Sequence, residues 1–314
     1  MCSPQSHDSA ASGYHTPVLA NEVVGFLHGK ERVLDGTLGG GAHALALLER
    51  GATVTALDRD PEAIAAASVR LREYEQSGRF RPILGNFAGI DDIDATAGAR
   101  FDGILLDLGV SSHQLDEQGR GFSFREGALL DMRMGPDAPD DAATLLGAAS
   151  ERELAQIFRE YGDEPRAGRL AREIVRRRAN RPFETSDDLV GAIRGTLGPR
   201  AGPPDFARLF QAVRIAVNDE LSALAVALPA LRDHLEPDGV IVVIAYHSGE
   251  DRLVKHSFRD WSAACVCPPR QPICTCRGRA LGETLTRKPV VASDEEIATN
   301  PRARSARLRA WRAA

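Results

Sequence analysis

Short apolar runs alternate with helix-like segments through the first third of the chain. The segments 53–58, 80–84 and 101–107 have strand character, and apolar helical patterns at 45–49 and 61–71 lie between or before them. The segments 101–107 and 239–245 are largely apolar on both faces, as expected of central strands in a parallel sheet. This alternation predicts an α/β fold with a doubly wound sheet.

A long interval separates the last two of these strand-like segments. About 130 residues lie between 107 and 239, although a crossover between parallel strands needs only a dozen or more. Helix signals fill the interval: Ser150 with Glu153 forms a capping-box pattern, and Thr185 precedes another apolar run. We expect a further single long helix over about 205–234 to return the chain to the sheet.

These patterns predict three parts of the chain. Residues 116–212 are expected to form an inserted all-helical domain, and residues 14–115 plus 213–314 the sheet domain that surrounds it. Residues 1–13 are small and polar and predict a disordered tail. An alternating segment near the C-terminus, rich in arginine, predicts a last strand with exposed arginines.

The most informative stretch is the glycine-dense segment 33–43. An apolar strand end runs into Asp35, then into a loop that contains Gly39 and Gly41, and then into a helix. Glycines let backbone N–H groups approach a ligand without a Cβ in the way. Asp58 ends the second strand and is placed to accept hydrogen bonds from ribose hydroxyls. The pair predicts a nucleotide site.

The acidic residue before the glycine loop, Asp35, indicates which nucleotide derivative binds. The segment 39–44 fits G-x-G-x-x-A, the dinucleotide fingerprint, but adjacent glycines satisfy many patterns. A carboxylate at Asp35 would repel a pyrophosphate and suits a cationic amino-acid tail. S-adenosylmethionine (SAM) has such a tail and no phosphate. A glycine-rich turn in an unrelated α/β protein is the alternative interpretation.

Two further residues follow predicted strand ends at the same edge of the sheet. Phe87 comes just after the segment 80–84 and could stack on adenine, or instead plug the sheet edge. Asp107 ends the central segment 101–107 and is expected beside the cofactor cleft, with capping of the next turn as the alternative.

Composition and charge limit the classes of protein to which the chain could belong. The chain has 314 residues, is 43% hydrophobic and carries a net charge of −5, so it is not coated in basic surface. We see no signal peptide and no apolar run near the roughly 20 residues needed to cross a bilayer, so we expect a cytoplasmic protein. Within residues 166–181 seven arginines face a single acid, Glu173. This helix predicts a phosphate-facing surface, or else a plain solvated face.

Five cysteines are present, and four of them form two C-x-C pairs around a proline-rich turn: Cys265, Cys267, Cys274 and Cys276. Four thiols this close could hold a structural zinc ion. The usual spacing is C-x-x-C and no histidine supports the group. A zinc site and reduced thiols in a loop are therefore both possible interpretations of these four cysteines.

Several motifs in order resemble one known family. They are residues 15–19 (HTPVL), 35–43 (DGTLGGGAH), 106–112 (LDLGVSS), 120–124 (RGFSF), 131–134 (DMRM), 210–215 (FQAVRI) and 247–252 (HSGEDR). Together they resemble the ribosomal RNA small subunit methyltransferase H family, over nearly everything from residue 14 to residue 309.

The resemblance implies a fold, an activity and a set of contacts. It implies a class I SAM-dependent methyltransferase core with an inserted helical domain, and methylation of the N4 amine of a cytidine in 16S rRNA at the decoding centre of the small ribosomal subunit. The SAM contacts that it implies fall on Gly41, Ala42, His43, Asp58, Phe87, Asp107 and Gln114. Ala42 stands where a second glycine is common, and Gly249 replaces a bulkier apolar residue; neither change removes a side-chain ligand.

The catalytic role is assigned by position. Other N4-amine methyltransferases carry Asp/Asn-Pro-Pro-aromatic at this strand end, whereas this chain has Asp-Leu-Gly-Val from Asp107. We expect Asp107 to be catalytic, with a role as a SAM contact alone as the alternative. We expect 16S rRNA in the small subunit as partner, no membrane partner and no catalytic metal; a homodimer stays open. The rival hypotheses are a nicotinamide-dependent oxidoreductase, a DNA cytosine methyltransferase and a non-catalytic RNA-binding assembly factor.

Overall fold

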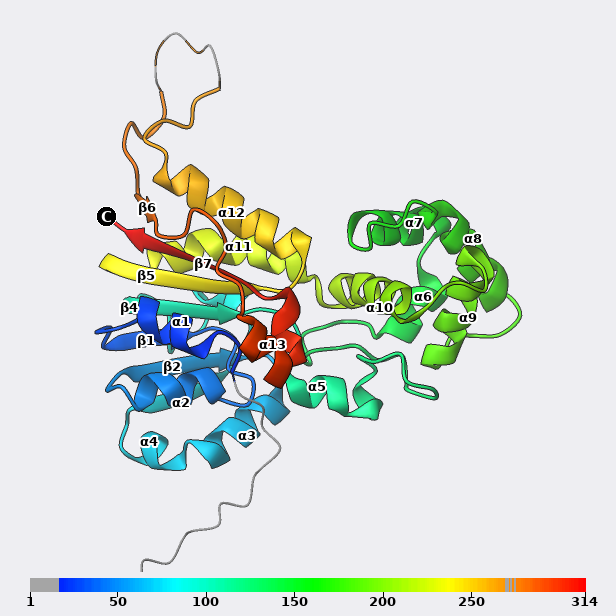
Figure 1. Cartoon of the computed structure of the whole chain (residues 1–314), viewed down its shortest axis with the longest axis horizontal. Coiled ribbons are helices and arrows are strands. Elements are labelled where there is room, and N and C mark those ends of the chain that lie inside the picture. Colours follow the sequence, from blue (N-terminus) through cyan, green and yellow to red (C-terminus); the bar gives the residue numbers. More distant parts are fainter. Residues whose placement is uncertain (1–16, 269–270, 272, 274) are drawn as a thin grey trace, which may run out of the picture.

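A computed structural model describes residues 17–268, 271, 273 and 275–314. The predicted tail, residues 1–13, lies outside this part of the chain. Figure 1 shows a sheet flanked by helices, with a separate group of helices beside it. The predicted α/β class with a helical insertion is therefore confirmed.

One seven-stranded sheet organises the larger part, in the order β3-β2-β1-β4-β5-β7-β6. The first five strands in this order run parallel, and β7 pairs antiparallel with both β5 and β6. The strands are β1 (Arg32–Asp35), β2 (Thr53–Asp58), β3 (Phe80–Leu84), β4 (Phe101–Asp107), β5 (Leu235–Ala245), β6 (Gly282–Thr284) and β7 (Arg307–Ala313). The order reverses between β1 and β4, which is where open α/β sheets bind ligands.

The central strands are apolar on both faces because helices cover both. Leu105 of β4 packs in one core with α1, α2 and α3, while Ile104 and Leu106 pack in the other with α11 and α12. The helices and 3-10 turns of this part are α1 (Ala20–Phe26), α2 (Ala42–Leu48), α3 (Pro61–Arg70), α4 (Arg72–Gln76), η1 (Phe87–Gly89), α11 (Glu220–Asp233), α12 (Ser248–Ser262), α13 (Asp294–Thr299) and η3 (Pro301–Ser305).

The helical lobe has its own core, formed by buried residues from Phe122 to Val217. After α5 (Ser112–Asp116) and η2 (Gln118–Arg120) it contains α6 (Ala142–Ala148), α7 (Glu151–Glu160), α8 (Ala167–Arg178), α9 (Ser186–Leu197) and α10 (Pro203–Asn218). The predicted division after residue 212 falls inside α10, which is one continuous helix. The division into domains stays a prediction.

One local prediction is wrong, and a second is wrong in part. The expected single helix over 205–234 is two helices, because Asp219 takes a left-handed conformation (φ 49°) between α10 and α11. The predicted last strand is β7, and Arg307 is exposed as expected, but the strand does not alternate because residues 308–311 are all buried. Its neighbours β5 and β6 enclose it, and Arg309, 6% exposed, forms a buried ion pair with Asp251 at 2.7 Å.

Candidate functional site

The glycine loop joins β1 to α2 and is held by its neighbours. The Gly39 N–H donates to Asp58 Oδ2 at 2.7 Å, which fastens the loop to the end of β2. Gly41 precedes α2 with φ 74°, and a Cβ there would lie 3.1 Å from Leu71 on the α3 side. Glycine is therefore required at residue 41 both for the turn and for close packing.

Asp35 lies beneath this loop. Its side chain is 1% exposed and does not line the cavity described below, so the structure places it behind the site. Its Oδ1 accepts the Thr37 N–H at 3.1 Å, whereas no hydrogen-bond partner of its Oδ2 is found in the described part of the chain. Burial raises the pKa of Asp35 to about 7.

Asp58 is at the predicted position, at the carboxyl end of β2. Its two oxygens accept the N–H groups of Gly39 and Asp60, at 2.7 and 2.9 Å. Burial raises the pKa of Asp58 to about 6, although both N–H groups act against this rise. Each carboxylate oxygen has a second lone pair, so Asp58 can still accept from a ribose hydroxyl.

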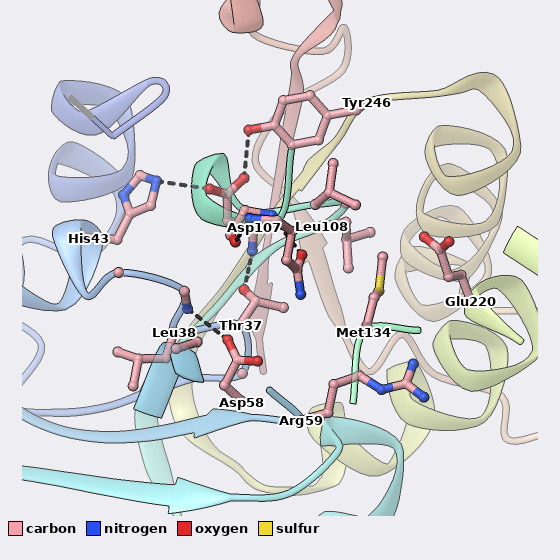
Figure 2. A pocket seen from close by; sticks show the side chains of 18 of the residues that line it. Thr37, Leu38, His43, Asp58, Arg59, Asp107, Leu108, Met134, Glu220 and Tyr246 are labelled. Carbon is pink, nitrogen blue, oxygen red and sulfur yellow. Dashed lines mark hydrogen bonds and ion pairs between the residues drawn. The ribbon is translucent and has the colours of Figure 1, made fainter. Parts of the chain in front are cut away.

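Asp107 ends β4 at the centre of a small polar cluster (Figure 2). Its Oδ1 accepts the Tyr246 hydroxyl at 2.8 Å, and its backbone N–H donates to Thr37 Oγ1 at 2.6 Å. Its Oδ2 lies 3.4 Å from Nε2 of His43, an ion-pair distance without the direction of a hydrogen bond. Burial and the Asp107 charge hold the pKa of Tyr246 well above its usual value, so the phenol stays a donor.

His43, on α2, is 7% exposed, and neither ring nitrogen has a hydrogen-bond partner among the described residues. Burial opposes protonation of His43, but the Asp107 and Asp35 carboxylates outweigh it and raise the pKa of the imidazole. A buried polar group normally has a partner. Because His43 lines the cavity described below, its ring nitrogens indicate that a polar ligand completes the site.

A cavity of about 400 Å³ lies over this edge of the sheet. Six of the seven predicted contacts line it: Ala42, His43, Asp58, Phe87, Asp107 and Gln114. The seventh, Gly41, lies in the same loop but does not line it, while Gly39 and Gly40 do. Most of the residues predicted from the sequence therefore lie in one site. Their contacts with a cofactor stay predictions.

Phe87 and Gln114 line the cavity and also make contacts that stabilise the fold. Phe87 starts η1 and packs against the sheet core while one side faces the cavity, so both interpretations of Phe87 stay compatible with its position. Gln114 is 5% exposed; its amide donates to Asp60 Oδ2 at 2.8 Å and accepts the Ser111 N–H at 3.0 Å. It caps α5 and steadies this wall of the cavity.

Several lining residues were not predicted. Tyr246 is the most important, because it follows β5 and reaches Asp107 across the strand end. Arg214 and Glu220 pair at 2.8 Å at the junction of α10 and α11. Met134 comes from the segment that enters the helical lobe, and Asn218 Oδ1 accepts its N–H at 2.8 Å. The signal for Tyr246 was its place beyond a strand parallel to β4.

The cavity fits SAM on observations of its own. Its size lies within the usual range for small-molecule sites, roughly 300–1,000 Å³, and its walls combine apolar residues with the polar edge described above. The carboxylates of Asp58 and Asp107 on its wall suit a cationic ligand. No helix in the described segments is long and apolar enough to cross a membrane.

The sheet order, the glycine loop and this cavity define a class I SAM-dependent methyltransferase. The profile of the MraW methylase family matches residues 12–314. The "Ribosomal RNA small subunit methyltransferase H" of Gemmatimonas aurantiaca is 65% identical over 310 residues, covering 98% of each chain. That of Anaeromyxobacter dehalogenans is 49% identical over 303 residues, covering 94% of this chain and 96% of its own.

Among solved structures, an rRNA methylase from Streptococcus thermophilus aligns with a TM-score of 0.41 and 10% identity, covering 94% of this chain and 93% of its own. That likeness is too distant to add to what the family shows. The chain belongs to the MraW methylase family, and it is a SAM-dependent methyltransferase. This finding excludes a nicotinamide-dependent oxidoreductase and a non-catalytic assembly factor.

Proposed function

We propose that this enzyme methylates the N4 amine of a cytidine in 16S rRNA, at the decoding centre of the small ribosomal subunit. The observation that carries the proposal is the Asp107 carboxylate at the end of β4, held by the Tyr246 hydroxyl at 2.8 Å on the wall of the cofactor cavity. The names of the relatives support an rRNA substrate. A cytoplasmic location follows from that substrate and is part of the proposal.

The cofactor contacts are proposed residue by residue. Asp58 holds the ribose, His43 with the loop of Gly41 and Ala42 holds the methionine end, and Phe87 lies against the adenine. Gln114 orders the wall through Asp60. When bound, SAM supplies an electrophilic methyl group on a sulfonium sulfur that leaves as a neutral thioether.

Asp107 acts on the nucleophile. The exocyclic amine of cytosine is weakly nucleophilic because its lone pair is delocalised into the ring. Asp107 accepts a hydrogen bond from one amine proton, which favours a pyramidal nitrogen whose lone pair is free to form the new N–C bond. The carboxylate then receives that proton and passes it to solvent. The Tyr246 hydroxyl holds Oδ1 and so fixes the orientation of the carboxylate.

The RNA surface is proposed on the helical lobe, and it is smaller than the arginine pattern suggested. Arg176 and Arg177 pair with Glu173 at 2.8 and 2.7 Å, and Arg178 donates to two backbone carbonyls near the end of α6. Arg169 and Arg172 are exposed on α8, and their side chains make no ion pair or hydrogen bond within the described residues. These two side chains are available to phosphates.

The proposal is tested with labelled SAM and three substrates: naked 16S rRNA, intact small subunits and duplex DNA. Product nucleosides are identified by mass spectrometry. We expect N4-methylcytidine from small subunits. Methyl transfer only to DNA would contradict the RNA substrate and favour the DNA cytosine alternative. The homodimer stays a prediction for sedimentation of the purified protein.

A further inference from the structure

The loop between α12 and β6 has a fixed base and an exposed far end. At the base, the Arg277 guanidinium donates to the carbonyl oxygens of Asp260 and Ala263, and the Leu281 N–H donates to the Trp261 carbonyl at 2.8 Å. Farther out, Val266 and Ile273 are 44% and 75% exposed. The apolar side chains described here therefore do not form a core that would order the loop.

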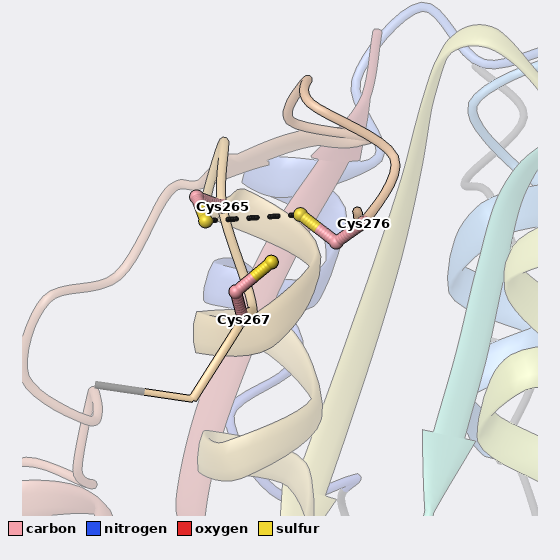
Figure 3. Close-up of side chains that lie close together, drawn as sticks. All are labelled: Cys265, Cys267 and Cys276. Atoms are coloured by element: carbon pink, nitrogen blue, oxygen red, sulfur yellow. Dashed lines mark hydrogen bonds between the residues drawn. The ribbon is translucent and has the colours of Figure 1, made fainter. Parts of the chain in front are cut away.

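Three thiols gather in this loop from its two arms. The sulfurs of Cys265, Cys267 and Cys276 all lie within 4.8 Å of one another, and those of Cys265 and Cys276 are 3.7 Å apart (Figure 3). Sulfurs around a tetrahedral zinc ion, with Zn–S near 2.3 Å, lie roughly 3.8 Å apart. A disulfide requires about 2.05 Å. The Cys265–Cys276 distance matches that of two sulfurs on a shared ion, and Cys267 is close enough to join them.

A second contact favours thiolates. The Val266 N–H points at Sγ of Cys276, at 3.4 Å, across the loop. A backbone donor of this kind stabilises a negatively charged sulfur and orients it as a metal ligand. Cys265 is exposed and the other two thiols are partly exposed. Accessible thiols are open to oxidation, so a bound ion also explains how three of them coexist in one loop.

We propose that Cys265, Cys267 and Cys276 bind a structural Zn²⁺ ion. Each thiol loses its proton to solvent as its Zn–S bond forms, and no oxidant or reductant takes part. Soft thiolate ligands favour zinc over hard cations. The ion joins the outgoing arm, at Cys265 and Cys267, to the returning arm at Cys276, and so orders a loop that lacks a core. Cys274 lies outside the described residues and is not part of this assignment.

The test is metal analysis of the full chain, purified without chelators after growth with zinc. We expect about one zinc per chain, and at least a tenfold lower content in a Cys265→Ser/Cys276→Ser double variant. The matched control is Cys2→Ser, which removes the one cysteine outside the loop segment and should keep the metal. Circular dichroism checks that each variant is folded.

Replacement of zinc by Co²⁺ gives a readout of the ligands themselves. We expect a thiolate-to-cobalt charge-transfer band in the wild type that the double variant loses. Three results would overturn the proposal: wild-type protein that takes up no zinc on titration, a double variant that keeps its zinc, or a metal-free wild type whose intact mass is lower by two hydrogens, as in a disulfide.

Discussion

Two regions of this molecule differ in how fully the chain itself satisfies their buried polar groups. In the helical lobe, Glu164 is 3% exposed, and its oxygens accept from the Arg166 N–H at 2.8 Å and from Arg208 at 2.7 Å. At the carboxyl edge of the sheet, Asp35 Oδ2 and both nitrogens of His43 lack hydrogen-bond partners among the described residues.

The difference distinguishes buried polar groups that stabilise the fold from those that bind a ligand. A buried group without a partner costs about 1–3 kcal/mol, so a chain retains such groups where a ligand supplies the partner. The lobe satisfies its buried carboxylate internally and needs no ligand for stability. At the sheet edge, we expect a polar group of the cofactor to supply the partner that His43 lacks.

The largest effect is expected at Asp107. Asp107→Ala removes the acceptor for the amine proton, and we expect turnover to fall about 10³-fold while SAM affinity changes little. Single-turnover methyl transfer and calorimetric SAM binding check this. The control is Asp92→Ala, an exposed acid away from the cavity. SAM affinity that falls in step with turnover would make Asp107 a cofactor contact only.

A stability effect is expected at Asp35 in the absence of SAM. Because burial raises its folded pKa to about 7, its contribution to stability is present at low pH and is lost as pH rises through about 7. We expect the wild type to lose about 2 kcal/mol of unfolding free energy between pH 5 and pH 8 from this group. Urea melts of Asp35→Asn should show a weaker loss. Parallel pH profiles for the two proteins would contradict this account.

A smaller effect on rate is expected at Tyr246. Tyr246→Phe keeps the ring but removes the hydroxyl that holds Asp107 Oδ1. We expect kcat to fall about tenfold, since a hydrogen bond to a charged group contributes about 1.5 kcal/mol, with SAM affinity unchanged. An unaltered kcat would show that Asp107 needs no positioning by Tyr246.

The smallest effect is expected on the lobe surface. Arg169→Gln with Arg172→Gln should raise KM for small subunits by a fewfold and weaken its salt dependence, because phosphate contacts release counterions. Arg176→Gln is the matched control, because Arg176 already pairs with Glu173. An equal rise in KM for the control would place the RNA surface elsewhere.

The parts that the sequence predicted are those fixed by local patterns. The segments 80–84 and 101–107 match β3 and β4 to the residue. For β4 the reason is burial on both faces, which leaves an apolar run that ends at an acid. Asp58 and Asp107 were found because parallel strands end at the same edge of a sheet.

The parts that were missed depend on distant partners. Tyr246 lies 139 residues from Asp107 in the chain, so only the register of β4 and β5 brings them together. The break at Asp219 was hidden because a left-handed residue need not be glycine. Arg309 looked exposed until Asp251, on α12, gave it a buried partner.

The most direct test of the difference between the two regions is the stabilisation that SAM gives to variants of each. Near 100 times its dissociation constant, a ligand adds about 2.7 kcal/mol, measured as a rise in the unfolding temperature. We expect the wild type and Glu164→Gln, in the lobe, to gain the same rise, and Asp58→Ala to gain much less. An undiminished rise in a cooperatively folding Asp58→Ala would contradict the assignment of the sheet edge as the cofactor site.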